Sequence, residues 1–140
     1  EAAEALRGVV ERSPRSSEGG EALRALGGLG DRLLDGPDSA EASMAYRAVL
    51  AAGIVDDDAV YSNLALAAYR MGRKSEAIDV LQQGLARMPG SARLHLRAGR
   101  LLGEAGRRDE AEREYRRAIE LDGASSEAAQ AREALARLAP

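Results

Sequence analysis

Three arginines, Arg93, Arg97 and Arg100, are spaced i, i+4 and i+7 in this sequence. In an α-helix this spacing places their guanidinium groups on one face. A guanidinium group binds a carboxylate or phosphate through paired hydrogen bonds. Together with Asn63 and Arg70, which lie earlier in the sequence, the three arginines are expected to receive an acidic side chain or the C-terminal carboxylate of a polypeptide. A solvated basic face without a ligand is the alternative, and the sequence favours neither.

Other residues that could do chemistry have simpler interpretations. The carboxylates of Asp56–Asp58 could ligate a cation, but consecutive turn residues do not converge on one ion, and we expect them to cap the helix that follows. Gly27–Gly30 follows no predicted strand, so it is not expected to be a phosphate-binding loop. The single histidine, His95, could be a general base. The sequence has no Cys, no GxxxxGK and no HExxH, and we expect no catalytic residue, metal or cofactor.

The composition narrows the class of partner. The 140 residues carry a net charge of −3 with both signs interspersed, so no excess of basic charge is available for nucleic acid. No apolar run approaches the roughly 20 residues that span a bilayer, and the first residues lack the pattern of a signal peptide. Abundant Ala, Leu, Arg and Glu favour helices. The excess of Ala, Gly and Arg is typical of a GC-rich bacterium, and it does not separate a cytoplasmic from a periplasmic location.

The sequence repeats itself at intervals of 34 and 35 residues. Aligning 58–91 with 92–125 matches Gly72 with Gly106, and an interval of 35 brings in 23–57. An interval of 75 matches the N-terminal segment to the second half of the unit. The second half therefore occurs four times and the first half three times, as in a repeat array.

These repeats resemble the tetratricopeptide repeat family, which places small, large apolar and aromatic residues at fixed offsets. The matches in 58–91 are Tyr61, Leu64, Ala65, Gly72, Ala77, Leu81, Gly84 and Pro89, and those in 92–125 are His95, Ala98, Gly99, Gly106, Ala111, Tyr115 and Ala118. The stretch 23–57 is degenerate but keeps Leu26, Leu29, Gly30, Ala42 and Tyr46. The resemblance implies an all-α solenoid of antiparallel helix pairs in a right-handed superhelix. His95 stands where the family packs an aromatic ring, which favours packing over catalysis.

The repeat predicts eight helices, at 1–13, 21–35, 38–52, 57–71, 74–87, 91–105, 108–121 and 125–138, with 13–20 as a linker. It divides the sequence into the second helix of a truncated repeat (1–16), repeats at 23–57, 58–91 and 92–125, and a capping helix (126–140). Gly72 and Gly106 are expected to end their helices in left-handed turns. Asp38 and Glu41 are expected to form a capping box. The glycine-rich helix 21–35 is expected to be the weakest.

By resemblance, ligands bind the concave face formed by the first helix of each pair. The residues implied as a peptide-binding groove are Asn63, Leu66, Arg70, Arg93, Arg97 and Arg100. Some family members hold the C-terminal carboxylate of heat-shock chaperones at five positions, which correspond here to Gly27, Asp31, Asn63, Arg93 and Arg97. Asp31 would repel a carboxylate, so chaperone binding is not expected.

The resemblance implies a protein–protein interaction scaffold that binds a peptide or partner helix. One alternative is a regulatory or substrate-docking appendage of an enzyme whose catalytic domain lies outside these residues. Another is a homodimer formed through an open N-terminal edge, where Leu6, Val9 and Val10 are expected to lack a partner on one side. A fragment of a larger bacterial protein is favoured over the homodimer, because terminal repeats normally carry caps.

Overall fold

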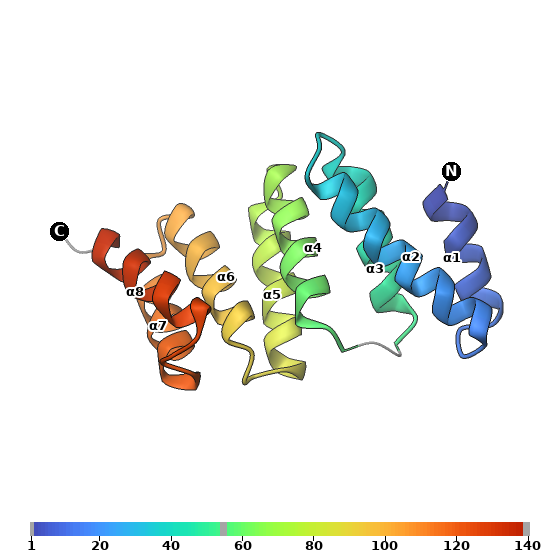
Figure 1. Ribbon diagram of the computed structural model, residues 1–140. Coiled ribbons are helices and arrows are strands. Elements are labelled where there is room, and N and C mark those ends of the chain that lie inside the picture. The colour runs from blue at the N-terminus through green and yellow to red at the C-terminus, as the bar shows by residue number, and fades with distance from the viewer. Residues whose placement is uncertain (1, 54–55, 139–140) are drawn as a thin grey trace.

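The computed structural model describes residues 2–53 and 56–138, which contain eight α-helices and no strand. The helices are α1 (Ala2–Arg12), α2 (Ser17–Leu34), α3 (Ser39–Ala51), α4 (Asp58–Arg70), α5 (Lys74–Arg87), α6 (Ala92–Glu104), α7 (Arg108–Leu121) and α8 (Ser126–Leu138). They stack in sequence order from α1 at one end of the array to α8 at the other (Figure 1). The predicted all-α solenoid of helix pairs is confirmed. Within the described residues, no helix has the length and apolar character needed to cross a membrane.

Glycine sets the turns inside the second and third helix pairs. Gly72 follows α4 and Gly106 follows α6, with φ of 76° and 78°, in the left-handed region that other residues avoid. After α4, the N–H of Arg73 donates to the carbonyl of Ala68 at 3.0 Å, and the N–H of Gly72 donates to that of Tyr69 at 2.9 Å. These are the two hydrogen bonds of a Schellman motif. The predicted left-handed helix ends are confirmed.

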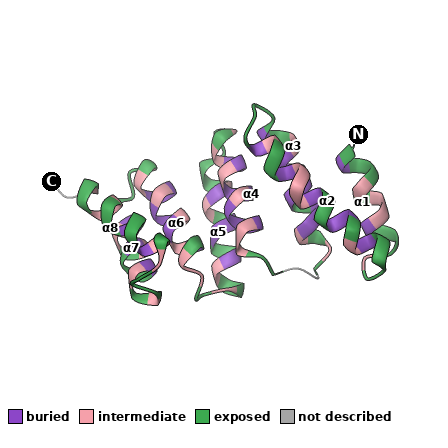
Figure 2. Ribbon diagram, in the orientation of Figure 1, coloured by how far each residue is buried: buried purple, intermediate pink, exposed green. Residues whose placement is uncertain are grey.

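One tyrosine ring covers one glycine in each of the three helix pairs. The partners are Tyr46 with Gly30, Tyr61 with Gly84, and Tyr115 with Gly99. A Cβ added to Gly99 would lie 2.6 Å from the ring of Tyr115, closer than packed atoms approach. All three rings are buried, and the buried positions follow the facing sides of the helices (Figure 2). A protein without Phe or Trp therefore fills each pair with one ring and makes room for it with a glycine.

Residues 13–20 are not the linker that their composition predicted. The helix α2 begins at Ser17, and the Oγ of Ser16 caps it by accepting a hydrogen bond from the N–H of Gly19 at 3.0 Å. A Cβ on Gly19 would overlap the carbonyl oxygen of Ser13. The glycine therefore permits a close turn between α1 and α2.

Asp38 precedes α3 as predicted, but the capping box with Glu41 does not form. The backbone of Asp38 has φ −91° and ψ 50°, outside the extended region usual for a capping residue, and its side chain makes no capping hydrogen bond. That backbone conformation explains why the sequence signature was misleading here.

The two end helices differ in how fully they are covered. Val10 of α1 is buried in the core, while Leu6 and Val9 are half-buried, so the expectation of an uncovered stripe is wrong for Val10. At the other end, α8 buries Ala128 and Ala131 and packs against α6 and α7.

Candidate functional site

A groove runs along the face formed by α2, α4, α6 and α8. Its N-terminal section is a hollow of 420 Å³ lined by Gly20, Leu23, Arg24, Gly27, Gly28, Asp31, Tyr46, Val49, Asp57, Ala59, Val60 and Asn63. Its C-terminal section is a hollow of 360 Å³ lined by Ala59, Ser62, Asn63, Arg93, Leu96, Arg97, Arg100, Glu127 and Gln130. The two sections share Ala59 and Asn63 on α4, so they form one continuous surface.

Two arginines of the C-terminal section donate to neutral oxygens rather than to carboxylates. The Nε of Arg97 donates to the Oγ of Ser62 on α4 at 3.0 Å. The Nη2 of Arg100 donates to the Oε1 of Gln130 on α8 at 2.6 Å. Within the described residues, neither guanidinium has a carboxylate at ion-pair distance. Two positive charges of the groove therefore lack an ionic partner in the described part of the protein.

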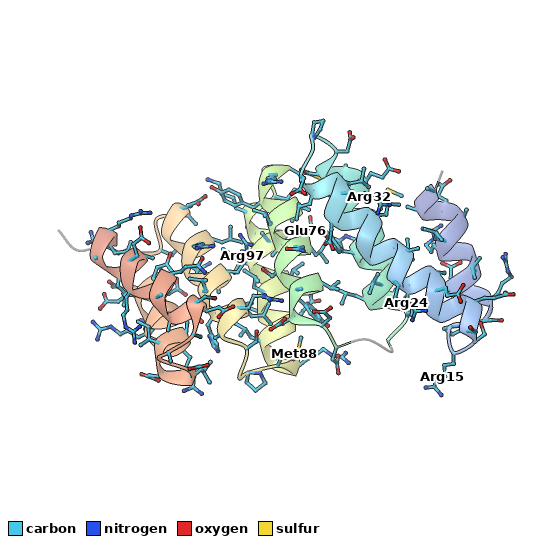
Figure 3. The ribbon with its side chains drawn as sticks, in the orientation of Figure 1. Arg15, Arg24, Arg32, Glu76, Met88 and Arg97 are labelled. Atoms are coloured by element: carbon cyan, nitrogen blue, oxygen red, sulfur yellow. The ribbon has the colours of Figure 1, made fainter. Side chains whose placement is uncertain are left out.

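The charge of Arg97 lies in an unfavourable environment. Its side chain extends from α6 towards α4 and is half-buried (Figure 3). Burial, followed by the positive charges of Arg100 and Arg70, lowers the pKa of the Arg97 guanidinium, while the charge of Glu104 opposes this. An anion in the C-terminal section would offset the repulsion among these guanidinium groups.

The N-terminal section contains a carboxylate that is already hydrogen-bonded. One oxygen of Asp31 accepts a hydrogen bond from the hydroxyl of Tyr46 at 2.6 Å and another from the amide of Asn63 at 3.2 Å. Burial, together with the hydrogen bond to Asp31, raises the pKa of Tyr46, so this hydroxyl remains a donor. These bonds connect α2, α3 and α4 at the point where the two sections of the groove meet.

Two sequence models of the family described as tetratricopeptide repeat match this sequence, over residues 68–138 and 28–92. The first of them covers half of the 140 residues. The protein belongs to the tetratricopeptide repeat family.

Solved structures of tetratricopeptide repeat proteins have the same fold at about one-fifth sequence identity. The TPR domain of Arabidopsis OM64 is 20% identical, with a TM-score of 0.73, over 84% of this protein and 94% of that one. The first TPR of Spaghetti (RPAP3) bound to the HSP90 peptide SRMEEVD is 20% identical, with a TM-score of 0.69, over 84% and 94%. The Yersinia enterocolitica type III secretion chaperone SycD in complex with a peptide of the translocator YopD is 20% identical, with a TM-score of 0.74, over 84% and 92%. No curated protein sequence matches this one.

The five positions that correspond to the family's carboxylate clamp are partly occupied by contacts within the protein. Asn63 donates to Asp31, and the Nη1 of Arg93 forms an ion pair with Asp58 at 3.0 Å. Gly27 has no side chain to contribute. Of the two arginines among the five, only Arg97 lacks an ionic partner in the described residues.

Four of the six predicted groove residues line the C-terminal section, namely Asn63, Arg93, Arg97 and Arg100. Leu66 is instead partly buried against the core. Arg70 donates to the carbonyl of Leu34 at the end of α2, and its positive charge acts on Arg97.

Two groove residues, Glu127 and Gln130 of α8, were not predicted from the sequence, because this helix was treated as a cap. A signal for them was present. They lie 34 residues after Arg93 and Leu96, which line the same section on α6. Extending the repeat interval into α8 would have placed them in the groove.

His95 lies between α6 and α7, away from the groove. Its Nδ1 lies 2.6 Å from the Oε2 of Glu114, and its Nε2 lies 2.9 Å from the carbonyl oxygen of Pro89. Burial disfavours the protonated ring, but the hydrogen bonds to Glu114 and Pro89 outweigh burial and raise the pKa of His95. The side chain is 12% exposed, which agrees with the predicted packing role.

The three consecutive aspartates have separate partners. Asp57 caps α4 by accepting a hydrogen bond from the N–H of Ala59 at 2.9 Å. Asp56 pairs with Arg87 at 2.8 Å, and Asp58 pairs with Arg93. The predicted helix-capping role is confirmed for Asp57.

Proposed function

We propose that this tetratricopeptide repeat protein binds a segment of another protein in its groove, with an acidic side chain or a C-terminal carboxylate placed against Arg97 and Arg100. The observation that carries the proposal is that these two guanidinium groups line the C-terminal section and form no ion pair among the described residues. Ionised hydrogen bonds to a carboxylate are stronger than those to the neutral oxygens of Ser62 and Gln130. A bound carboxylate would therefore improve the surroundings of both arginines.

Related folds support a peptide as the ligand. The RPAP3 and SycD structures each contain a peptide from another protein. In this protein the groove crosses several helix pairs, which suits an extended segment better than a compact small molecule. The groove residues we propose for binding are Asn63, Arg93, Arg97 and Arg100.

We also propose that these residues catalyse no reaction. Tetratricopeptide repeat domains are typically interaction modules without catalysis. The one histidine is hydrogen-bonded on both ring nitrogens between α6 and α7. His95 lines neither section of the groove where a ligand is proposed to bind.

A peptide selection tests the proposal. Random twelve-residue peptides displayed on phage are selected on the immobilised protein, and the enriched sequences are synthesised with a fluorescent label. We expect enrichment of Asp, Glu or a free C-terminus. We also expect the Arg97→Gln/Arg100→Gln variant to bind the selected peptides at least about tenfold more weakly, with the difference shrinking at high salt.

The matched control is Arg7→Gln/Arg116→Gln, which removes two exposed arginines that pair with Glu11 and Glu112 and line neither section of the groove. This control should bind like the unaltered protein. Equal binding by the groove variant and the control, or a selection without acidic peptides, contradicts the proposal.

A further inference from the structure

The N-terminal section of the groove is hollow because of glycines that the fold itself does not need. A Cβ on Gly27 would meet no atom within 4 Å, and one on Gly28 would meet only the flexible end of Arg32 at 3.6 Å. Both residues lie inside the continuous helix α2, where each glycine lowers helix stability by about 1 kcal/mol relative to alanine. By contrast, Gly30 in the same helix is required by the ring of Tyr46.

The missing side chains leave a hollow with an apolar floor. Leu23 from α2, Val49 from α3 and Val60 from α4 are each less than a tenth exposed and line the 420 Å³ space together with the ring of Tyr46. A side chain larger than glycine at Gly27 would project into this space. The floor therefore offers apolar contacts from three helices to a group that enters from the groove.

Both carboxylates of this section are already engaged within the protein, while Arg24 adds one exposed positive charge. Asp31 accepts hydrogen bonds from Tyr46 and Asn63, and Asp57 caps α4. The two carboxylates outnumber Arg24, so the net negative charge disfavours an acidic group here. It directs that group to the C-terminal section, where three arginines outnumber Glu127. Because Ala59 and Asn63 join the two sections, one extended segment can occupy both.

We infer that the ligand is a linear peptide with two recognition elements: a large apolar side chain that enters the hollow at Gly27 and Gly28, and an acidic group beyond it that meets Arg97 and Arg100. The inference rests on the proposed function and adds the chemistry and order of the ligand along the groove. The apolar element lies over α2, α3 and α4, and the acidic element lies over α4, α6 and α8.

The test uses a defined peptide set and a variant that fills the hollow. The peptides are labelled, twelve residues long and built on Ser, Gly and Asn. Each carries one Leu and one Glu-Glu pair, and the set covers every separation and both orders of these two elements. We expect the unaltered protein to prefer one order and a narrow range of separations. Gly27→Leu should weaken binding of the preferred peptide by about tenfold or more while raising the melting temperature of the protein.

Two controls keep the result interpretable. Gly8→Leu adds the same side chain to α1, where a Cβ meets only the end of Arg12 at 3.6 Å. No residue of α1 lines either section of the groove, so peptide binding should not change. Gly27→Ala adds a smaller group, keeps α2 helical and should weaken binding less than Gly27→Leu. If Gly27→Leu fails to fold, the same comparison is made with Gly27→Ala.

Peptide variants separate failure of this inference from failure of the proposed function. Replacing Leu by Ser in the preferred peptide should weaken binding to the unaltered protein but not to Gly27→Leu, whereas replacing Glu-Glu by Asn-Asn should weaken binding to both. Acidic peptides that bind equally with or without Leu would overturn the inference and leave the proposed function standing. Absence of binding by every acidic peptide would overturn both.

Discussion

The first helix pair, α2 with α3, and the third, α6 with α7, share their interior residues. An interval of 69 residues superimposes Gly30 on Gly99 and Tyr46 on Tyr115. In both pairs the glycine lies on the first helix and the tyrosine on the second, with the ring against the glycine. The second pair achieves the same contact in reverse, with Tyr61 on its first helix. The residue types in the interior of a pair are therefore determined by how closely its two helices must approach.

The groove faces of the same two pairs have opposite chemistry. At the same interval, the groove positions of α2 and α6 are Gly27 and Leu96, Gly28 and Arg97, and Asp31 and Arg100. One helix presents an apolar hollow beside a carboxylate, and the other presents two guanidinium groups. The contact between ring and glycine does not fix the residues at the groove positions, so these can differ between repeats and suit a ligand with two unlike ends.

Removing the rings should produce the largest effect and should be similar in the two pairs. Tyr46→Ala and Tyr115→Ala each leave a cavity between two helices, so we expect each to lower the free energy of unfolding by about 3–5 kcal/mol. Urea titrations followed by circular dichroism measure this. Loss of the hydrogen bond to Asp31 should make Tyr46→Ala the more destabilising of the two. A loss below about 1 kcal/mol in either pair would break the equivalence of the two interiors.

Adding a methyl group under each ring should produce an intermediate effect. In Gly30→Ala and Gly99→Ala the new Cβ would lie 2.8 Å and 2.6 Å from the tyrosine ring, so the helices must separate. We expect a loss of about 1–3 kcal/mol in each, measured by the same titration. The matched control is Gly27→Ala, which meets no atom within 4 Å and should raise stability by about 0.5–1 kcal/mol. If Gly30→Ala and Gly27→Ala changed the free energy of unfolding in the same direction, contact with the tyrosine ring would not distinguish these two glycines.

The sequence predicts the helix pairs because their interior residues recur at a fixed interval, and each recurrence follows from the close packing of two helices. The prediction from sequence is less accurate at helix starts, where residue composition does not determine the backbone conformation. Ser16 and Gly19 have the composition of a linker, yet one caps α2 and the other permits its close contact with Ser13. Asp38 has a capping signature, but its backbone conformation does not support the bond.

The candidate site could be predicted only in part. Helical spacing determines the face of a helix from which a side chain projects, but not the residues of other helices that it contacts. The spacing correctly grouped Arg97 and Arg100, since both project from one face of α6. Their partners, Ser62 and Gln130, come from helices about one repeat before and after, which spacing within α6 does not reveal. The hollow at Gly27 could not be predicted, because a glycine in a helical sequence indicates lower helix stability and does not reveal the space that its missing side chain leaves.

The smallest predicted effect concerns one interior position at which the two pairs differ. His95 in α6 is superimposed on Leu26 in α2, which is fully buried. The ring of His95 faces Glu114, the carbonyl of Pro89 and the charge of Arg117, and its pKa is raised above 6.5 in the folded protein.

The contribution of His95 to stability is therefore complete below pH 6.5, where its ring is also protonated in the unfolded protein, and is lost as the pH rises through the folded pKa. We expect the free energy of unfolding to fall as the pH rises above 6.5, and His95→Leu, which copies the first pair, to remove this step. The measurement is a urea titration at several pH values, with Leu26→Met as a control that should keep the step. A step of equal size in His95→Leu would show that another group causes the pH dependence, because leucine has no proton to lose.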